Sequence, residues 1–245
     1  MLDLEMIGQG ATTNIYRDGG TAIKLYANAS YDEVCSEAER QRFAHGAGLP
    51  VPGVYGVRRL DGNAVALDMA YINGQPLMRP GMDKDERRNA LHTLVKLQCI
   101  VHRVDATHLR KQSDVLTWKI NHSQFMDDPL KKALVALLNR LDKNAVSLCH
   151  GDFHPLNILY DGQKHWIIDW VDATAGNPLA DACRTYLIFK QHMARSAGIY
   201  LRAFCETAGA KQEDVLAWLP VVAAARLDEN IDNKTRLWLL NLIKT

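Results

Sequence analysis

The sequence lacks several features that would assign it to an extracellular or membrane class. It has five cysteines in 245 residues, and no two of them form a CxxC pair, so we expect reduced thiols in the core of a cytoplasmic protein. No run of about 18 uncharged apolar residues occurs, so no membrane-spanning helix is predicted. The N-terminal residues have no basic region followed by an apolar stretch, and we expect no secretory signal.

A strong charge bias is also missing. The 29 basic and 28 acidic residues leave a formal net charge of +1, which argues against a broad nucleic-acid or membrane-surface footprint. The sequence shows no internal repeat and no low-complexity tract. Its hydrophobic content of 47% over 245 residues is sufficient for a full core in one or two lobes.

Strand-forming segments and turn signals alternate over the first 72 residues. Strands are expected at residues 4–7, 14–17, 21–26, 54–58 and 64–69. Asp18-Gly19-Gly20 predicts a hairpin turn, because Asp and Gly tolerate the positive φ of tight turns. Ser30 with Glu33 matches a capping box, which predicts a helix that starts there and ends at residues 46–48.

Beyond a hinge expected near residues 70–75, the pattern becomes mostly helical. Helices are predicted from the cap at Asp83 to about residue 105, at 113–126 and 128–142, and from 178 onward. Short strands at 146–149, 158–160 and 165–168 interrupt this region. We therefore predict an α+β fold with a small β-rich lobe at residues 1–72 and a larger, mostly helical lobe at 73–245.

The most informative segment is His150-Gly151-Asp152-Phe153-His154-Pro155-Leu156-Asn157, followed by Asp169 at the end of an apolar strand. Phosphoryl transfer needs two oxygen ligands for magnesium and a carboxylate that orients the attacking hydroxyl. Asp152 is the candidate catalytic base, and Asn157 and Asp169 are the candidate magnesium ligands. The structural alternative is a polar turn whose side chains only cap backbone groups.

The histidines on either side of Asp152 allow a second interpretation. His150 and His154 could join Asp152 in a metal site of a hydrolase, because imidazole is a good zinc ligand. No HExxH motif or second ligand cluster accompanies them, so the sequence favours a supporting role for His150 and partial exposure for His154.

Lys24 lies in a predicted strand with apolar neighbours. A lysine there can reach the α- and β-phosphates of a nucleotide when a helix glutamate holds it in place. Glu37 is the favoured partner, and Glu33 and Glu39 are alternatives. Taken alone, Lys24 is better explained as an ordinary strand lysine whose ammonium reaches water, and the motif at residues 150–157 is what favours the phosphate-binding role.

The segment Gly8-Gln9-Gly10-Ala11-Thr12-Thr13 precedes Lys24 and has small and hydroxyl residues in a predicted turn. Backbone amides of Gly8 and Gly10, with Thr12 or Thr13, could cover a phosphate. The segment lacks the third glycine of GxGxxG, so a plain hairpin explains it as well.

Together these motifs resemble the aminoglycoside phosphotransferase and choline kinase-like family, small-molecule relatives of the protein kinases. The resemblance rests on residues 150–159, on Ile167-Ile168-Asp169-Trp170 and on Ala22-Ile23-Lys24, and it spans about residues 7 to 190. It implies a two-lobed, protein-kinase-like fold that binds ATP or GTP with Mg2+ in the cleft. It also implies that Met69, Ala70 and Ile72 form the hinge that holds the nucleobase, and that Asp181 supports the catalytic loop.

The acceptor is the open question. By the resemblance it is a small hydroxylated molecule that is aminoglycoside-, choline- or amino-alcohol-like, because no activation segment of protein-kinase length separates Asp169 from Asp181. Cationic acceptors need carboxylates, and the candidates are Asp172, Asp228, Glu229 and Asp232, of which Asp228 and Asp232 would share a face at helical spacing. The alternative is a solvated helix face, or carboxylates paired with the charges of Arg226 and Arg236. The alternative function is a non-catalytic, nucleotide-binding regulatory module, which the short acceptor region and sparse glycines leave open.

Overall fold

The computed structural model describes residues 4–10 and 13–243. The chain divides into two compact units, one formed by Met1–Arg79 and Pro155–Asp172, the other by Pro80–His154 and Ala173–Thr245. The predicted α+β class is confirmed, since a five-stranded antiparallel sheet precedes a mostly helical region. The lobe boundary between residues 72 and 73 stays a prediction. The first unit also contains Pro155–Asp172, a segment from much later in the chain. No helix among the described residues is both long enough and apolar enough to cross a bilayer.

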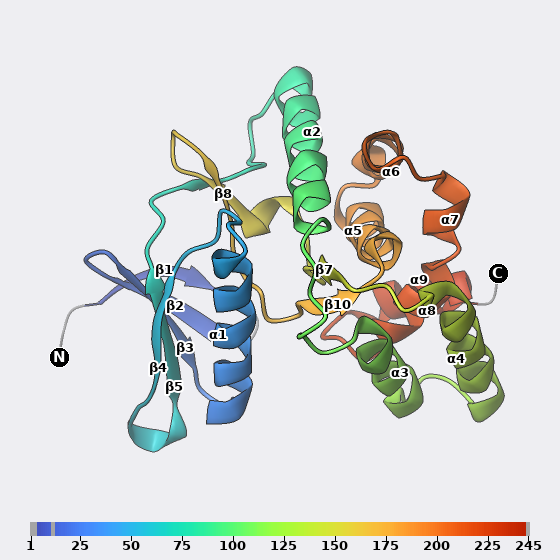
Figure 1. Ribbon diagram of the computed structural model, residues 1–245, viewed down its shortest axis with the longest axis horizontal. Coiled ribbons are helices and arrows are strands. Elements are labelled where there is room, and N and C mark those ends of the chain that lie inside the picture. Colours follow the sequence, from blue (N-terminus) through green and yellow to red (C-terminus); the bar gives the residue numbers. More distant parts are fainter. Residues whose placement is uncertain (1–3, 11–12, 244–245) are drawn as a thin grey trace. The chain divides into compact units, whose positions relative to one another are not determined.

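The first unit is built on an antiparallel sheet with the strand order β1-β2-β3-β5-β4. Its strands are β1 (Glu5–Gln9), β2 (Thr13–Asp18), β3 (Thr21–Tyr26), β4 (Val54–Arg59) and β5 (Val65–Ala70), with a 3-10 turn, η1 (Asp61–Asn63), between the last two. Helix α1 (Tyr31–Gly46) packs on one face of this sheet (Figure 1). The β2–β3 hairpin turns at Gly19, which has a positive φ of 55°, as the Asp-Gly-Gly signal predicts.

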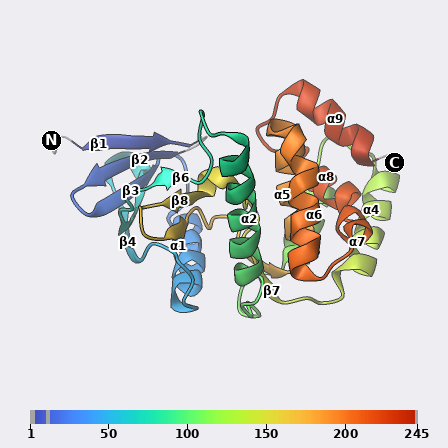
Figure 2. The ribbon, with the colours of Figure 1, turned by 90° about the horizontal axis from the view of Figure 1, so that it is seen from above.

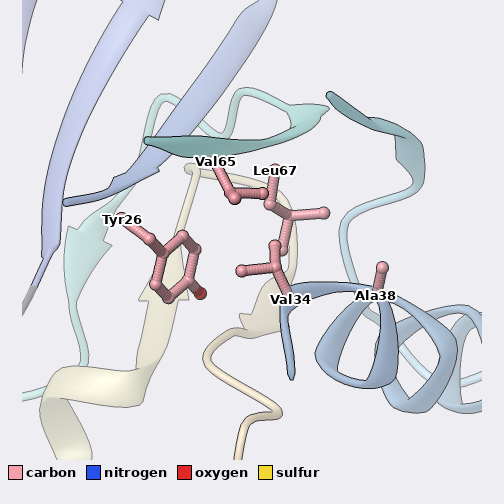
Figure 3. Close-up of a cluster of buried hydrophobic side chains, with 5 residues drawn as sticks. All are labelled: Tyr26, Val34, Ala38, Val65 and Leu67. Atoms are coloured by element: carbon pink, nitrogen blue, oxygen red, sulfur yellow. The ribbon is translucent and has the colours of Figure 1, made fainter. Parts of the chain in front are cut away.

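The start of α1 is fixed by the capping box that the sequence predicts. Ser30 accepts a hydrogen bond from the Glu33 amide, and the Glu33 side chain accepts one from the Ser30 amide. Figure 3 shows the core between helix and sheet, where Val34 and Ala38 of α1 face Tyr26, Val65 and Leu67. Since Glu37 lies on the same helix, this packing also sets the position of its carboxylate.

A second sheet joins the later segment to the first unit. Its strands, in the order β6-β8-β9, are β6 (Gln75–Pro76), β8 (Ile158–Tyr160) and β9 (His165–Ile167), and η2 (Pro155–Asn157) leads into β8. Gly74 lies so close to β8 that an added Cβ would stand 3.1 Å from both the Leu159 Cβ and the Tyr160 carbonyl oxygen. Only glycine therefore fits without a shift, and this approach places Asn157 and Asp169 in the first unit.

The second unit is helical around one short strand pair. It contains α2 (Lys84–Val101), α3 (Gln112–His122), α4 (Asp128–Asp142), α5 (Pro178–His192), α6 (Ala194–Ala208), α7 (Gln212–Leu216), α8 (Leu219–Ala225) and α9 (Asn233–Ile243), with β7 (Ser147–Cys149) paired to β10 (Thr174–Gly176). Helices α5 and α6 run side by side (Figure 2). The second predicted capping box, Asp83 with Glu86, is present at the start of α2.

Two local expectations are wrong. Gly8 does not interrupt the first strand, because β1 runs through it to Gln9 and absorbs the irregularity as a register shift between Met6 and Gly8. Residues 228–232 are not helical, since α8 ends at Ala225 and α9 begins at Asn233. Asp228 and Asp232 therefore do not share a helix face.

Candidate active site

A cavity of about 430 Å³ in the first unit gathers most of the residues that the sequence singled out for nucleotide and metal binding. The predicted residues among its lining are Gly8, Gly10, Thr13, Lys24, Glu37, Met69, Ala70, Ile72, Asn157 and Asp169. Thr12 lies outside the described residues. These positions come from strands, a helix and a loop that are distant in sequence, so the cavity is a product of the fold and not of one motif.

Lys24 lies between two carboxylates at this cavity. Its Nζ donates to Glu37 Oε1 at 2.8 Å and to Asp169 Oδ1 at 2.9 Å. Of the three candidate partners for Lys24, the structure therefore selects Glu37. Burial opposes the charged form of Lys24, but Asp169 and Glu37 outweigh it and hold the pKa of Lys24 well above its usual range.

Tyr26 completes this buried group from the same strand as Lys24. Its hydroxyl donates to Glu37 Oε2, and burial raises the pKa of Tyr26 so that the hydroxyl stays protonated. Glu37 thus has each carboxylate oxygen occupied, one by Lys24 and one by Tyr26. The side chain of Glu37 is only 2% exposed, and these two donors satisfy a charge that would otherwise be costly to bury.

The two candidate magnesium ligands lie at the ends of short elements of the first unit. Asn157 is the last residue of η2 and is buried, and its carbonyl accepts a hydrogen bond from the Ile168 amide at 3.0 Å. Asp169 has a φ of 65°, a left-handed conformation that Asp and Asn tolerate better than most residues. Asn157 and Asp169 offer hard oxygen donors of the kind that Mg2+ prefers.

The hinge residues at the other side of the cavity have specific backbone partners. The Ala70 amide donates to the Gly53 carbonyl at 2.8 Å, and the Tyr71 amide donates to the Gly20 carbonyl at 2.9 Å. Within the described part of the chain, no backbone carbonyl accepts from the Ile72 amide. Aliphatic side chains complete the lining here, namely Ile7, Ile15, Ala22, Leu159 and Ile168. An apolar slot with one polar backbone edge suits a flat heterocycle.

The Gly10 amide, next to the end of β1, donates to the Thr13 carbonyl at the start of β2 at 2.7 Å. An added Cβ on Gly10 would stand 2.8 Å from Thr13 Oγ1. Gly10 therefore brings the Thr13 hydroxyl close to the backbone beside the cavity that both residues line.

The second unit holds Asp152 on the loop that follows β7. The Gly151 amide donates to Asp181 Oδ1 at 2.7 Å, which confirms that Asp181 supports this loop. His150 is fully buried, and its Nδ1 accepts from the Asp152 amide at 3.2 Å. Among the described residues, no three His, Cys, Asp or Glu side chains are arranged to hold a metal ion. His150 therefore supports the loop, as the sequence favours.

Two nitrogen-bearing side chains face the Asp152 carboxylate. His154 Nε2 lies 3.2 Å from Asp152 Oδ2, and Arg184 Nη2 lies 3.4 Å from Asp152 Oδ1. Burial acts to raise the pKa of Asp152, but the hydrogen bond from His154 and the charge of Arg184 outweigh it and hold this pKa well below its usual range. Asp152 is thus ionised and weakly basic at neutral pH.

The four candidate acceptor carboxylates have different surroundings. Asp228 accepts from the Gln124 amide at 3.3 Å, and Asp232 accepts from the Thr235 amide at 2.7 Å. Glu229 pairs with Arg184 at 2.6 Å, with Arg226 at 3.0 Å and with Lys119 at 3.9 Å. Asp172 is half-buried in the turn after Trp170. Glu229 is linked to Asp152 through Arg184.

Three residues of the site escaped the sequence analysis: Tyr26, Gln41 and Arg184. Gln41 lines the cavity and donates to the Pro52 carbonyl at 2.8 Å. Tyr26 could have been found, because strand alternation places it on the same face as Lys24. Arg184 carries no motif of its own. Its only signal is its position three residues after Asp181 on a predicted helix.

The profile of the phosphotransferase enzyme family (APH) matches residues 3–219, and the chain belongs to this family. No curated protein matches the sequence. Solved structures share the fold. A ternary complex of a thermostable variant of aminoglycoside phosphotransferase APH(4)-Ia with ADP and hygromycin B superposes with a TM-score of 0.72 at 16% identity, over 99% of this chain and 92% of that one.

Two further structures extend the range of related enzymes. A choline/ethanolamine kinase family protein from Mesorhizobium loti gives a TM-score of 0.68 at 19% identity, over 99% of this chain and 88% of that one. The GDP complex of aminoglycoside 2'-phosphotransferase-IIIa gives 0.66 at 14% identity, over 100% of this chain and 92% of that one. At these identities the likeness establishes the fold and leaves the acceptor open.

Proposed function

We propose that this protein is a magnesium-dependent kinase that transfers the γ-phosphate of ATP or GTP to a hydroxyl group of a small molecule. The observation that carries the proposal is the cavity of the first unit, where Lys24, Asn157 and Asp169 meet a hinge with an apolar slot. Relatives with this fold were solved with ADP, with GDP and with hygromycin B. A nucleotide as co-substrate places the reaction in the cytoplasm.

In this proposal the nucleobase enters the apolar slot against Met69, with its polar edge toward the Ala70 carbonyl and the Ile72 amide. Lys24, held by Glu37, binds the phosphates, and Gly8, Gly10, Thr12 and Thr13 cover them. Asn157 and Asp169 would hold Mg2+, which when bound neutralises charge on the phosphate oxygens. The Lys24–Asp169 ion pair keeps both groups satisfied until nucleotide and metal replace it.

Asp152 orients the acceptor hydroxyl. As the bond from the acceptor oxygen to the γ-phosphorus forms, the bond from that phosphorus to the β–γ bridging oxygen breaks, and the hydroxyl proton passes to Asp152. A depressed pKa makes Asp152 a poor acceptor early in this process. That property suits a loose transition state, in which the carboxylate positions the hydroxyl and takes its proton late.

The acceptor belongs to the class of small hydroxylated molecules, with aminoglycosides, choline and amino-alcohols as the first candidates. Asp228 and Asp232 already accept backbone hydrogen bonds, and Glu229 faces three cations. These three carboxylates therefore already have partners within the protein, and their contacts do not point to an amine on the acceptor. For this reason a test of acceptors should also include sugars and hydroxy acids.

The experiment is magnesium-dependent transfer of phosphate from labelled ATP and GTP to this panel, with Asp152→Asn as the blank. A phosphorylated product that is absent from the blank establishes the kinase and identifies its acceptor. If the wild-type protein binds nucleotide but neither forms a phosphorylated product nor hydrolyses the nucleotide, the proposal is contradicted. That result favours the non-catalytic regulatory module. Metal binding in the absence of nucleotide, with hydrolysis of an ester, would support the hydrolase instead.

A further inference from the structure

One face of α5 contacts three consecutive residues of the catalytic loop. Asp181 accepts from the Gly151 amide, Arg184 contacts the Asp152 carboxylate, and Thr185 donates to the Phe153 carbonyl at 2.9 Å. The three helix positions are i, i+3 and i+4, which form one stripe on an α-helix. Two of these contacts hold the backbone of the loop, and the Arg184 contact alone holds a side chain.

Arg184 is itself held in place. Its Nη1 donates to Glu229 Oε1 at 2.6 Å, and the other oxygen of Glu229 accepts from Arg226 Nε at 3.0 Å. Arg226 in turn donates to Gln191 of α5 at 3.0 Å. The Arg184 side chain is only 16% exposed. A planar guanidinium fixed at one end by a carboxylate has little freedom at its other end.

We propose that Arg184, fixed by Glu229, is a positioning residue that sets the orientation of the Asp152 carboxylate for phosphoryl transfer. The inference rests on the proposed kinase function and deepens it. Arg184 touches no reacting atom in this proposal and acts through Asp152. The charge of Arg184 also lowers the pKa of Asp152, which gives the proposal a readout that a purely structural residue would not move.

The test compares Arg184→Gln with Arg184→Lys in the full chain. The substrates are Mg-ATP and an acceptor from the panel, or water when no panel compound reacts. Arg184→Gln should lower kcat about 10- to 100-fold and leave the KM for ATP within about twofold, because an orientation error of this size affects the chemical step. The acidic limb of the kcat profile should move to higher pH, since an opposite charge near Asp152 has been removed.

Arg184→Lys separates charge from geometry. A lysine retains the positive charge, so the acidic limb should stay near that of the wild type. It lacks the planar fork by which Arg184 holds Glu229 with one nitrogen and Asp152 with another, so kcat should still fall. Arg202→Gln, an exposed arginine on α6, is the matched control and should behave as the wild type. Thermal unfolding of each variant shows that it is folded.

A double-variant cycle tests the role of Glu229. If Glu229 acts through Arg184, Glu229→Gln lowers kcat in the wild-type background and has no further effect in Arg184→Gln. Additive effects, or a wild-type kcat and pH profile in Arg184→Gln, overturn the inference while the kinase function stands.

If the wild-type protein neither transfers phosphate nor hydrolyses ATP, the proposed function fails. An NMR titration of the Asp152 carboxyl carbon then tests the Arg184 contact independently of activity. An unchanged Asp152 pKa in Arg184→Gln would then overturn it.

Discussion

The two units each contain a cation between two carboxylates, and the choice of cation differs. In the first unit Lys24 lies between Glu37 and Asp169, and in the second Arg184 lies between Glu229 and Asp152. In both, a glutamate holds the cation and an aspartate is the proposed functional group. Lysine is a compact charge on a flexible stem, whereas arginine is a planar fork. A lysine suits a contact that a nucleotide must replace, and an arginine suits a contact that must persist.

A third buried carboxylate, Asp181, extends the comparison because its titratable partner is a histidine. His102 Nε2 lies 2.9 Å from Asp181 Oδ2, and both side chains are nearly inaccessible. Asp181→Asn should lower the free energy of unfolding by about 3 kcal/mol. This value is the lower end of the range of destabilisation seen when one partner of a buried ion pair is removed. Urea unfolding at pH 7 measures this loss. A change below about 1 kcal/mol, the range of an ordinary hydrogen bond, would show that Asp181 is dispensable to the loop.

The same variant gives a pH test. Burial opposes ionisation of Asp181, but the hydrogen bond and charge of His102 outweigh it and lower the pKa of Asp181. The unfolded chain therefore binds this proton at a higher pH than the folded one. The stabilisation is complete above the unfolded value of about 3.9 and is lost as pH falls through the folded value. Below about pH 4, the unfolding free energy of the wild type should fall more steeply than that of Asp181→Asn.

Exchanging the cation type in the first unit tests the comparison directly. Lys24→Arg should weaken ATP binding about 10- to 100-fold, because the guanidinium fork remains bound to Glu37 and Asp169 instead of turning to the phosphates. Calorimetric titration with Mg-ATP measures the change. Lys164→Arg, an exposed lysine of the same unit, serves as the control. An Lys24→Arg protein with wild-type affinity would remove the distinction between a replaceable and a persistent contact.

A smaller effect is expected where a neutral donor supports the charged group. Tyr26→Phe removes the hydroxyl that donates to Glu37 and leaves one carboxylate oxygen buried without that partner. The unfolding free energy should fall by about 1–2 kcal/mol, and the KM for ATP should rise a few-fold. Tyr55→Phe, at a tyrosine that is 63% exposed, should change neither quantity. Equal values for Tyr26→Phe and the wild type would mean that Lys24 alone fixes Glu37.

The smallest effect is expected at the carboxylates outside these clusters. Asp232→Ala should lower the free energy of unfolding only slightly, because Asp232 accepts from the Thr235 amide in the first turn of α9 and acts as an exposed helix cap. The KM for the acceptor should not change. A rise in that KM would return Asp232 to the acceptor site and would restore an amine-containing acceptor as the first candidate.

Local signals in the sequence predicted much of the fold. The hairpin at Gly19 and the capping boxes at Ser30 and Asp83 are present, because each depends on residues adjacent in the chain. Helical spacing failed at residues 228–232, where the pattern of charges fits a helix but the chain turns. The short strand β10 was also missed, since its pairing with β7 is a long-range contact with no periodicity of its own.

The candidate site divides in the same way. Asp152, Asn157 and Asp169 were predictable because their spacing is specific to a known chemistry. Glu37 was favoured over Glu33 and Glu39 because it lies one turn below the predicted helix cap, and the structure places Glu37 against Lys24. Arg184 was not predictable. Helical spacing shows that Arg184 shares one stripe of the helix with Asp181, but it does not show which group of the catalytic loop Arg184 contacts.

The left-handed backbone at Asp169 limits how this position can change during evolution. With φ at 65°, β-branched and bulky residues are strained there whatever their chemistry, while Asn and Gly are tolerated. Genetic drift therefore has two accessible outcomes, an amide that retains one oxygen donor and a glycine that retains none. A glycine here would relieve the backbone and remove the carboxylate at the same time, so loss of the proposed metal ligand at this position carries no cost in backbone strain.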